Sequence, residues 1–270
     1  MTDHTLVISQ QIDLFSPRPA DLSIVEDIST EIRPSNVYTS TSEIVFNIHG
    51  NEGLYMDPQL TLICAFKVIN QDGTDLAAGA KVAPINLIPH TAFKQVTVKM
   101  NGIVISNSSN LYPYRSYMAI HLSYSTDPKL TWLQLHGYYA DTGDFSSTDP
   151  TNNKGFKSRQ TLAANSKTMY FMAPIQTDLG YQPRMIVPGV NMEINLVPSS
   201  DNFRLMSGTI TTKEQLKVQD IYIQAKYYRL IPSLALALEE TMRTQPCTIS
   251  NQQIGYKNIH CISGGYSFHS

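Results

Sequence analysis

Residues 95–105 read QVTVKMNGIVI, and this stretch restricts the folds that the chain can adopt. Before the Asn-Gly pair, the apolar residues Val96, Val98 and Met100 alternate with polar ones, which is the period of a strand with one buried face. Asn101 and Gly102 then separate two apolar runs. Both central residues of a type I′ turn need a positive φ, which Asn and Gly tolerate. The stretch therefore predicts a β-hairpin.

The same period of two continues on both sides of this hairpin. Residues 60–68 and 221–227 alternate most clearly, and shorter runs at 44–48, 168–172 and 192–196 follow the same pattern. These runs give about eight strand candidates, which is the number found in one jelly roll. We therefore predict an all-β protein, a jelly-roll β-sandwich with short helices in the connecting loops.

The composition supports strands over helices. Only 16% of the 270 residues are charged, against roughly 25% in ordinary soluble domains, whereas Ser, Thr, Asn and Gln total 79. Long amphipathic helices need charged residues on their wet faces. A net charge of -2 gives no general attraction to nucleic acid. The longest apolar run, residues 230–238, contains Pro232 and is shorter than the roughly 20 residues of a membrane span.

Three regions follow along the chain. Residues 1–40 mix Pro and polar residues without a clear period, which predicts an extended N-terminal arm. Residues 41–232 contain the predicted jelly roll. Residues 233–270 are expected to form a linker and further strands.

Two short helices and a loop are expected inside the roll. Pro113 can open the first helix, with Tyr114, Met118 and Leu122 on one stripe. The second begins near Asp127 and ends at Gly137. Residues 137–160 are rich in Asp, Ser, Thr, Asn and Gly, and predict a long exposed loop.

Motifs of common enzymes are missing from the sequence. It contains no Gly-x-Ser-x-Gly, His-Glu-x-x-His, Walker or Gly-x-Gly-x-x-Gly pattern. The seven His include no His-x-His pair of the kind that a cupin metal site uses. We therefore predict no catalytic residue, metal site or cofactor. The 15 Tyr favour core or interface packing. A carbohydrate-binding jelly roll and a cupin-like metalloenzyme remain as alternatives.

Residues 82–124 carry a more specific pattern, and shorter pieces follow in a consistent order up to residue 206. The matching residues in the first segment are Pro84, Asn86, His90, Phe93, Asn101, Gly102, Tyr112, Pro113, Tyr114, Arg115 and Tyr117. The later pieces are Gly155-Phe156 with Arg159, Asp178-Leu179 with Gln182 and Arg184, Gly189-Val190, and Phe203-Arg204-Leu205-Met206. Together they resemble the N-terminal half of the double jelly-roll major capsid proteins of Polinton/Maverick elements, adintoviruses and related double-stranded DNA viruses. The resemblance covers roughly residues 44–264 in one consistent order.

The resemblance implies a structural virion protein without enzymatic activity. In that family three two-roll chains form a pseudo-hexameric capsomer, and capsomers tile an icosahedral shell. The implied partners are further copies of the chain and other capsid proteins, with no small-molecule substrate and no sequence-specific nucleic acid. The implied location is the virion capsid, after synthesis in the host cell.

The matching residues, Arg184 included, are then packing or interface residues. Arg115 can serve as a cation that anchors a loop or an interface, or as the cap of a local turn. A double jelly roll also needs a second eight-stranded sandwich, and 38 residues follow residue 232. The sequence therefore resembles a truncated member in which residues 233–270 begin an incomplete second roll. A single-roll minor or vertex capsid protein remains as a further alternative.

Overall fold

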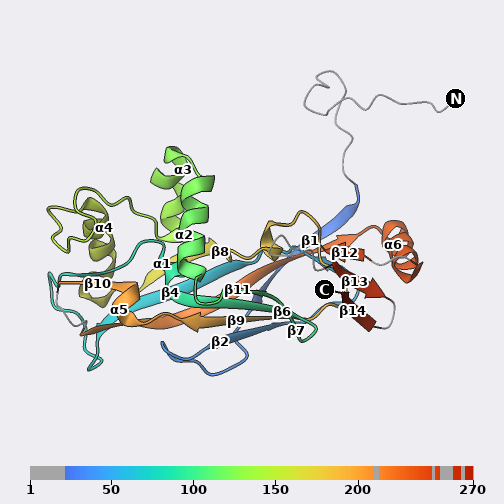
Figure 1. The fold of residues 1–270 in the computed structure, drawn as a ribbon, viewed down its shortest axis with the longest axis horizontal. Helices are drawn as coiled ribbons and strands as arrows, with labels where there is room; N and C mark the ends of the chain where they lie inside the picture. Colours follow the sequence, from blue (N-terminus) through green and yellow to red (C-terminus); the bar gives the residue numbers. More distant parts are fainter. Residues whose placement is uncertain (1–21, 209–212, 245–246, 250–257, 263–264, 270) are drawn as a thin grey trace, which may run out of the picture.

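Two sheets form most of the molecule (Figure 1), and the computed structural model describes residues 22–208, 213–244, 247–249, 258–262 and 265–269. The first sheet has the order β1 (Ile24–Ile32), β11 (Glu214–Leu230), β4 (Thr61–Asn70) and β8 (Met169–Pro174), with β3 (Leu54–Met56) paired to β11. The second has the order β2 (Ile44–Ile48), β9 (Met192–Pro198), β6 (Phe93–Met100) and β7 (Ile103–Asn107).

The topology follows from the pairing of the eight longer strands of these two sheets, which are β1, β2, β4, β6, β7, β8, β9 and β11. Counted along the chain, the first strand pairs with the eighth, the second with the seventh, the third with the sixth and the fourth with the fifth. All these pairs are antiparallel. A chain that is folded in half and then rolled into two sheets gives this order, which is a jelly roll. The predicted fold class is confirmed.

Alternating side chains from both sheets fill one core. In β9 every second residue, from Met192 to Pro198, is buried. Phe46 of the second sheet and Phe66 of the first are fully buried in the same cluster as Ile194 and Ile223. Each such side chain stabilises the fold by roughly 1.5–3 kcal/mol through removal from water. The period of two in the sequence therefore corresponds to the shared interior of the sandwich.

The predicted hairpin is confirmed between β6 and β7. Asn101 and Gly102 at its tip both have a positive φ, 48° and 82°. The Asn101 backbone N–H donates to the Asn191 carbonyl at 2.8 Å, and the Asn191 N–H donates to the Asn101 side-chain oxygen at 2.9 Å. Asn101 therefore forms the turn and also holds the start of the neighbouring strand β9.

Short helices lie in the connections. Figure 1 shows α2, α3 and α4 on one side of the roll, away from the end that carries α6. The helical elements are α1 (Ile88–Thr91), α2 (Tyr112–Ser123), α3 (Thr126–Leu130), η1 (Trp132–His136), α4 (Lys154–Ala163), η2 (Ala164–Ser166), η3 (Leu179–Tyr181), α5 (Asp201–Arg204) and α6 (Pro232–Thr244). A small ribbon pairs β5 (Val82–Pro84) with β10 (Leu205–Ser207). Within the described residues, no helix has the length and apolarity needed to cross a bilayer.

Two expectations about the chain's organisation need correction. The arm was expected to reach residue 40, but residues 24–32 form β1 and pair with β11 along the edge of the first sheet. Ile28 and Ile32 pack against the core, so the roll begins at β1 and not at residue 41. The expected loop 137–160 also contains the start of α4, where the Asn153 side chain caps the helix by accepting the Phe156 N–H. Residues 1–21 of the expected arm lie outside the described residues.

Helix α2 begins near Pro113 as predicted, but its predicted apolar stripe faces outward. Tyr114, Met118 and Leu122 are 58%, 61% and 82% exposed. The buried stripe of α2 includes Tyr112, Ser116 and Ile120 instead. The small polar Ser116 gives the inward face a weaker apolar signal than the outward face has, which explains the wrong assignment.

The strands predicted near the end of the chain are present. A separate three-stranded sheet has the order β12 (Cys247–Ile249), β13 (Asn258–Ile262) and β14 (Gly265–His269). Figure 1 shows it beside α6, at the opposite end of the molecule from α4. That these strands open a second roll stays a prediction.

Candidate functional site

The site begins at the turn that follows β5, where Asn86 joins two distant segments. Its side-chain N–H donates to the Tyr139 carbonyl, and its side-chain oxygen accepts the Tyr139 N–H, both at 2.8 Å. The Leu87 N–H donates to the Gly137 carbonyl at 3.1 Å, and Leu87 itself has a φ of 57°. The side chain of the predicted motif residue Asn86 therefore pairs with the Tyr139 backbone as a neighbouring strand would. It fixes the segment after η1 to the start of α1.

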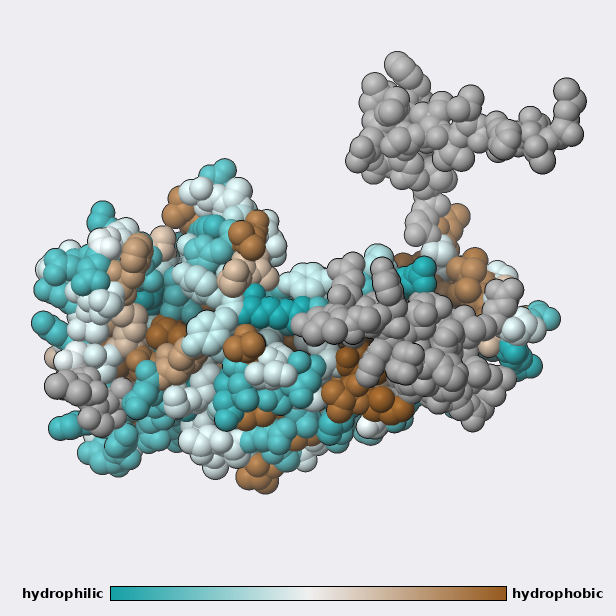
Figure 2. Space-filling view, in the orientation of Figure 1, coloured by the Kyte–Doolittle hydropathy of each residue, from teal (hydrophilic) through white to brown (hydrophobic). Residues whose placement is uncertain are grey.

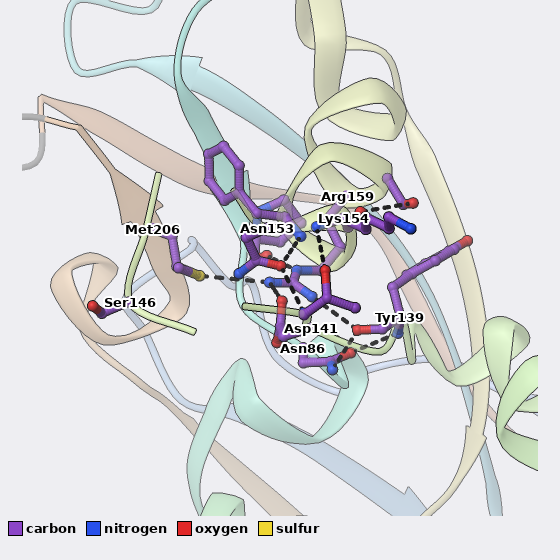
Figure 3. Close-up of polar contacts among 12 residues, drawn as sticks. Asn86, Tyr139, Asp141, Ser146, Asn153, Lys154, Arg159 and Met206 are labelled. Carbon is purple, nitrogen blue, oxygen red and sulfur yellow. Dashed lines mark hydrogen bonds and ion pairs between the residues drawn. The ribbon is translucent and has the colours of Figure 1, made fainter. Parts of the chain in front are cut away.

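Arg159 of α4 lies at the centre of this junction, as Figure 3 shows. Its side chain is 2% exposed, and its guanidinium donates to the carbonyls of Pro84 and Tyr139 at 3.0 and 3.1 Å. A third contact, 2.8 Å long, joins it to the Asp141 carboxylate. Removing one partner of a buried ion pair costs roughly 3–5 kcal/mol of folding stability, because the other charge is left buried. Arg159 thus holds β5, the segment after η1 and α4 together.

The first turn of α4 is fitted tightly against Asp141. A Cβ on Gly155 would lie 2.6 Å from the Asp141 carboxylate and 2.8 Å from the Ala140 carbonyl, so this position admits only Gly. Asn153 caps the helix by accepting the Phe156 N–H at 3.1 Å. The Gly155-Phe156 and Arg159 pieces of the sequence resemblance therefore have one structural reason, which is the close approach of α4 to Asp141.

A second buried arginine anchors the other side of the ribbon. Arg204 is 1% exposed and donates to Asp201 at 2.9 Å and to the Ser40 carbonyl at 3.0 Å. The Asp201 carboxylate also accepts the Leu216 N–H of β11 at 3.0 Å. Arg204 and Asp201 therefore tie the segment before β2 to the start of the last strand of the roll.

Helix α2 is held against the sandwich by Tyr112 and Arg115. The buried Tyr112 hydroxyl accepts the Gln176 N–H at 3.2 Å and lies 3.3 Å from His90 Nδ1. Burial raises the pKa of Tyr112 to about 12. Arg115 forms a two-pronged ion pair with the nearly buried Asp178, one prong 3.3 Å long. Of the two roles considered for Arg115, the structure supports the loop-anchoring cation.

Imidazoles form part of the same interface. His90 of α1 and His136 of η1 are 1% and 5% exposed, with ring centroids 6.1 Å apart. His90 Nε2 and His136 Nδ1 are buried without a hydrogen-bond partner. Burial lowers the pKa of His90 to about 3, helped by His136, and burial lowers the pKa of His136 to about 4. Both imidazoles are therefore neutral at physiological pH.

Outside this network lies a hollow of about 370 Å³, which we call the α2 groove. Figure 2 shows brown and tan surface in the hollow between the helices that Figure 1 labels α2 and α4. Tyr114, Tyr117 and Met118 of α2 form one wall, and Phe203 and Met206 form another. Tyr114 and Phe203 meet edge to face, with ring centroids 5.8 Å apart. The polar groups that border the groove, Asn86, Asp141 and Arg159, belong to the network described above.

The structure brings together many of the sequence-predicted residues. Seven of them lie in the network or border the groove, namely Pro84, Asn86, Tyr112, Pro113, Tyr114, Arg115 and Tyr117, and His90 contacts Tyr112. The remaining four lie elsewhere: Phe93 is buried at the start of β6, Asn101 and Gly102 form the hairpin tip, and Arg184 lies on the exposed segment after η3. The resemblance included Arg159 and Arg204, but no pattern in the sequence gave them a role.

The arrangement has the chemistry of an anchoring network. Its charged groups are paired with each other or with backbone carbonyls. Among the residues that the structure describes, no three His, Cys, Asp or Glu side chains form a group that could hold a metal ion. Rigid positioning of loops on the roll is what these contacts provide.

Comparisons of the sequence with known proteins do not assign the chain to a family. No family model matches the chain. An uncharacterized protein of Caenorhabditis elegans is 25% identical over 219 residues, which cover 78% of this chain and 50% of the relative.

Solved structures of low identity share the fold. A chain of the Sputnik virophage structure matches with a TM-score of 0.55 at 9% identity, covering 84% of this chain and 53% of the other. The Faustovirus major capsid protein matches with a TM-score of 0.54 at 12% identity, covering 90% and 59%. The PBCV-1 virus capsid matches with a TM-score of 0.53 at 11% identity, covering 83% and 46%. The chain therefore spans about half the length of the proteins it matches, and its fold is the jelly roll of capsid proteins.

Proposed function

We propose that this chain is a non-catalytic structural protein of a virion and belongs to a major capsid protein. The observation that carries the proposal is the complete eight-strand roll, whose fold is shared with the Faustovirus major capsid protein over 90% of this chain. A fold alone does not determine function, so the site must also suit the role. A network that fixes loops on a rigid roll suits a protein whose task is to present interlocking surfaces.

The finer part of the proposal concerns assembly. Copies associate with each other and with other capsid proteins, in the virion capsid, through trimeric pseudo-hexameric capsomers in which each subunit supplies two rolls. This chain spans 53% of the Sputnik chain and 59% of the Faustovirus chain, which is the share expected of a first roll with a small part of a second. A relationship to Polinton or adintovirus capsids rests on the sequence resemblance.

The α2 groove is the surface that we assign to subunit contact. Its walls carry exposed Tyr and Met side chains, in which interface cores are enriched, and the charged Asp141 and Arg159 at its border are paired with each other. A ring of subunits needs head-to-tail surfaces of this kind and no reaction centre.

Mass photometry and negative-stain microscopy of the purified chain test self-association. We expect particles larger than the 30.2 kDa monomer, and Tyr114→Lys with Met118→Lys should shift them toward the monomer. As a matched control, Leu236→Lys changes an exposed apolar residue on α6, at the other end of the molecule. A chain that remains monomeric at all concentrations contradicts the assignment of the α2 groove to subunit contact.

A carbohydrate-binding jelly roll is the second candidate, because exposed Tyr114 and Tyr117 line the groove. Sugar-binding sites use exposed aromatic rings in this way. Specific binding on a glycan array that Tyr114→Ala abolishes would favour this candidate over the capsid role.

A further inference from the structure

Strand β8 forms an edge of the first sheet and carries no charged side chain. It is the last strand in the order β1-β11-β4-β8, so within the described ranges its outer side has no strand partner. Its sequence, MYFMAP, contains no charged residue, and Tyr170 and Met172 are 76% and 43% exposed. Proteins usually protect an edge strand with charges, bulges or a covering segment, because its free backbone groups pair readily with another chain. The edge of β8 therefore lacks charge protection.

A groove of about 720 Å³ runs beside this edge, and we call it the edge groove. It is lined by residues 169–171 of β8 with Thr168 just before the strand, by Gln134 and Leu135 of η1, and by Thr161 and Leu162 of α4. Of this edge, the groove takes in only residues 169–171, which suits one short extended segment better than the whole edge of another roll. The groove therefore suits a single added strand.

The N-terminal residues have the composition that such a groove would bind. Residues 5–9 read TLVIS, a short run of β-branched and aliphatic residues. Residues 1–21 contain three Asp and one Arg, whereas Lys167 is the charged residue that lines the groove. Apolar strand residues therefore meet an apolar edge, and the acidic flank meets a basic residue.

The geometry favours a segment from a second copy. Through the strand registers, Met169 is level with Val218 of β11, and β1 begins opposite Leu230, 12 residues further along β11. At about 3.3 Å per residue along the strands and about 4.8 Å between them, these points are roughly 42 Å apart. An antiparallel addition places Ser9 at the Met169 end, and the residues between Ser9 and Ile24 span at most about 50 Å. A segment from the same copy would need this connection to be almost fully stretched.

We propose that residues 5–9 of one copy add as an antiparallel strand to the edge of β8 in a second copy, in the edge groove. The inference rests on the self-association in the proposed function and specifies one of its contacts. Exchange of this segment links neighbouring rolls without changing the rolls themselves.

Photo-crosslinking tests the contact in the full chain. A photoreactive benzoylphenylalanine replaces Tyr170, and equal amounts of isotope-labelled and unlabelled chain are mixed before irradiation. We expect cross-links from position 170 to residues 1–21 that join labelled to unlabelled chains. The matched control places the same probe at Phe145, an exposed aromatic residue that does not line the edge groove, and should give no such link.

Variants in the N-terminal segment provide a second readout. Val7→Asp with Ile8→Asp should reduce the cross-link by more than about tenfold, because each apolar side chain loses its burial. Gln10→Asp with Gln11→Asp adds the same charge outside the run and should leave the cross-link within about twofold of the original. Oligomers that form without this cross-link, or links only within one chain, overturn the inference and leave the proposed function standing. A chain that is monomeric throughout overturns both the inference and the self-association on which it rests.

Discussion

The buried imidazoles make the stability of the roll sensitive to acid. His90 and His136 lie between the helices and the sandwich, and one ring nitrogen of each, His90 Nε2 and His136 Nδ1, is buried without a hydrogen-bond partner. Burial lowers the pKa of His90 to about 3 and that of His136 to about 4, whereas an unfolded histidine titrates near 6.5. The unfolded chain therefore binds more protons than the folded chain below about pH 6.5. Their contribution to stability is fully present above that pH and is lost as the pH falls.

The magnitude follows from proton linkage. At pH 5 both folded-state pKa values are still below the solution pH, so each histidine favours the unfolded state by about 2 kcal/mol relative to pH 8. The two together reduce the free energy of unfolding by about 4 kcal/mol, a large part of the roughly 5–15 kcal/mol that a domain has.

Urea unfolding at pH values from 8 to 5 measures this loss. Trp132, whose ring lies 5.2 Å from that of His136, provides a fluorescence signal at the site itself. Replacing both residues, His90→Gln with His136→Gln, should remove most of the pH dependence, whatever it does to stability at pH 8. His49→Gln is the matched control, because His49 is exposed, and should keep the slope of the original protein. The reasoning is refuted if the double variant and the original protein lose equal stability between pH 8 and pH 5.

Three further outcomes are expected. Arg159→Met should lower the free energy of unfolding by about 3–5 kcal/mol in urea titrations, because the partly buried Asp141 carboxylate loses its partner; a loss below about 1 kcal/mol would contradict the anchoring role. Gly102→Ala should cost about 1 kcal/mol, since its φ is 82°, whereas Gly208→Ala, at a residue without a positive φ, should cost less; equal losses would count against the turn assignment. Arg115→Ala should speed amide hydrogen exchange in residues 175–182 while β4 and β11 stay protected, and unchanged exchange there would show that Asp178 does not depend on Arg115.

The long strands were predictable because each has one face in a shared core. β1 was not recognised, since of its nine residues Ile28 and Ile32 pack against the core and the rest are mainly exposed and polar. Its place in the sheet depends on backbone pairing with β11, which leaves no mark on the composition of β1 itself. The three-residue strands β5 and β10 are too short to show a period.

The anchoring network could be predicted only in part. Asn86, Tyr112 and Arg115 were identified through the resemblance, while the partners of Arg159 are 18 to 75 residues away in sequence. No local pattern shows that an arginine on a short polar helix will be buried. The cap at Asn153 was readable, because Asn before a helix accepts a free backbone N–H, and it would have placed α4 inside the expected loop.

The pairing of the first strand with the eighth has a consequence for how the chain folds. Ile24 of β1 lies opposite Leu230 of β11, so the edge of the first sheet closes only when residues separated by more than 200 positions meet. Contacts of this range pay the entropy of closing a long loop before they gain any burial, which makes folding slow. During synthesis, β1 and β4 of the first sheet are made long before β11, the strand that lies between them. Until β11 is made, the first sheet cannot be completed. Exposed strand edges in that interval are prone to wrong pairing, so the yield of folded protein should depend on synthesis rate and on chaperones.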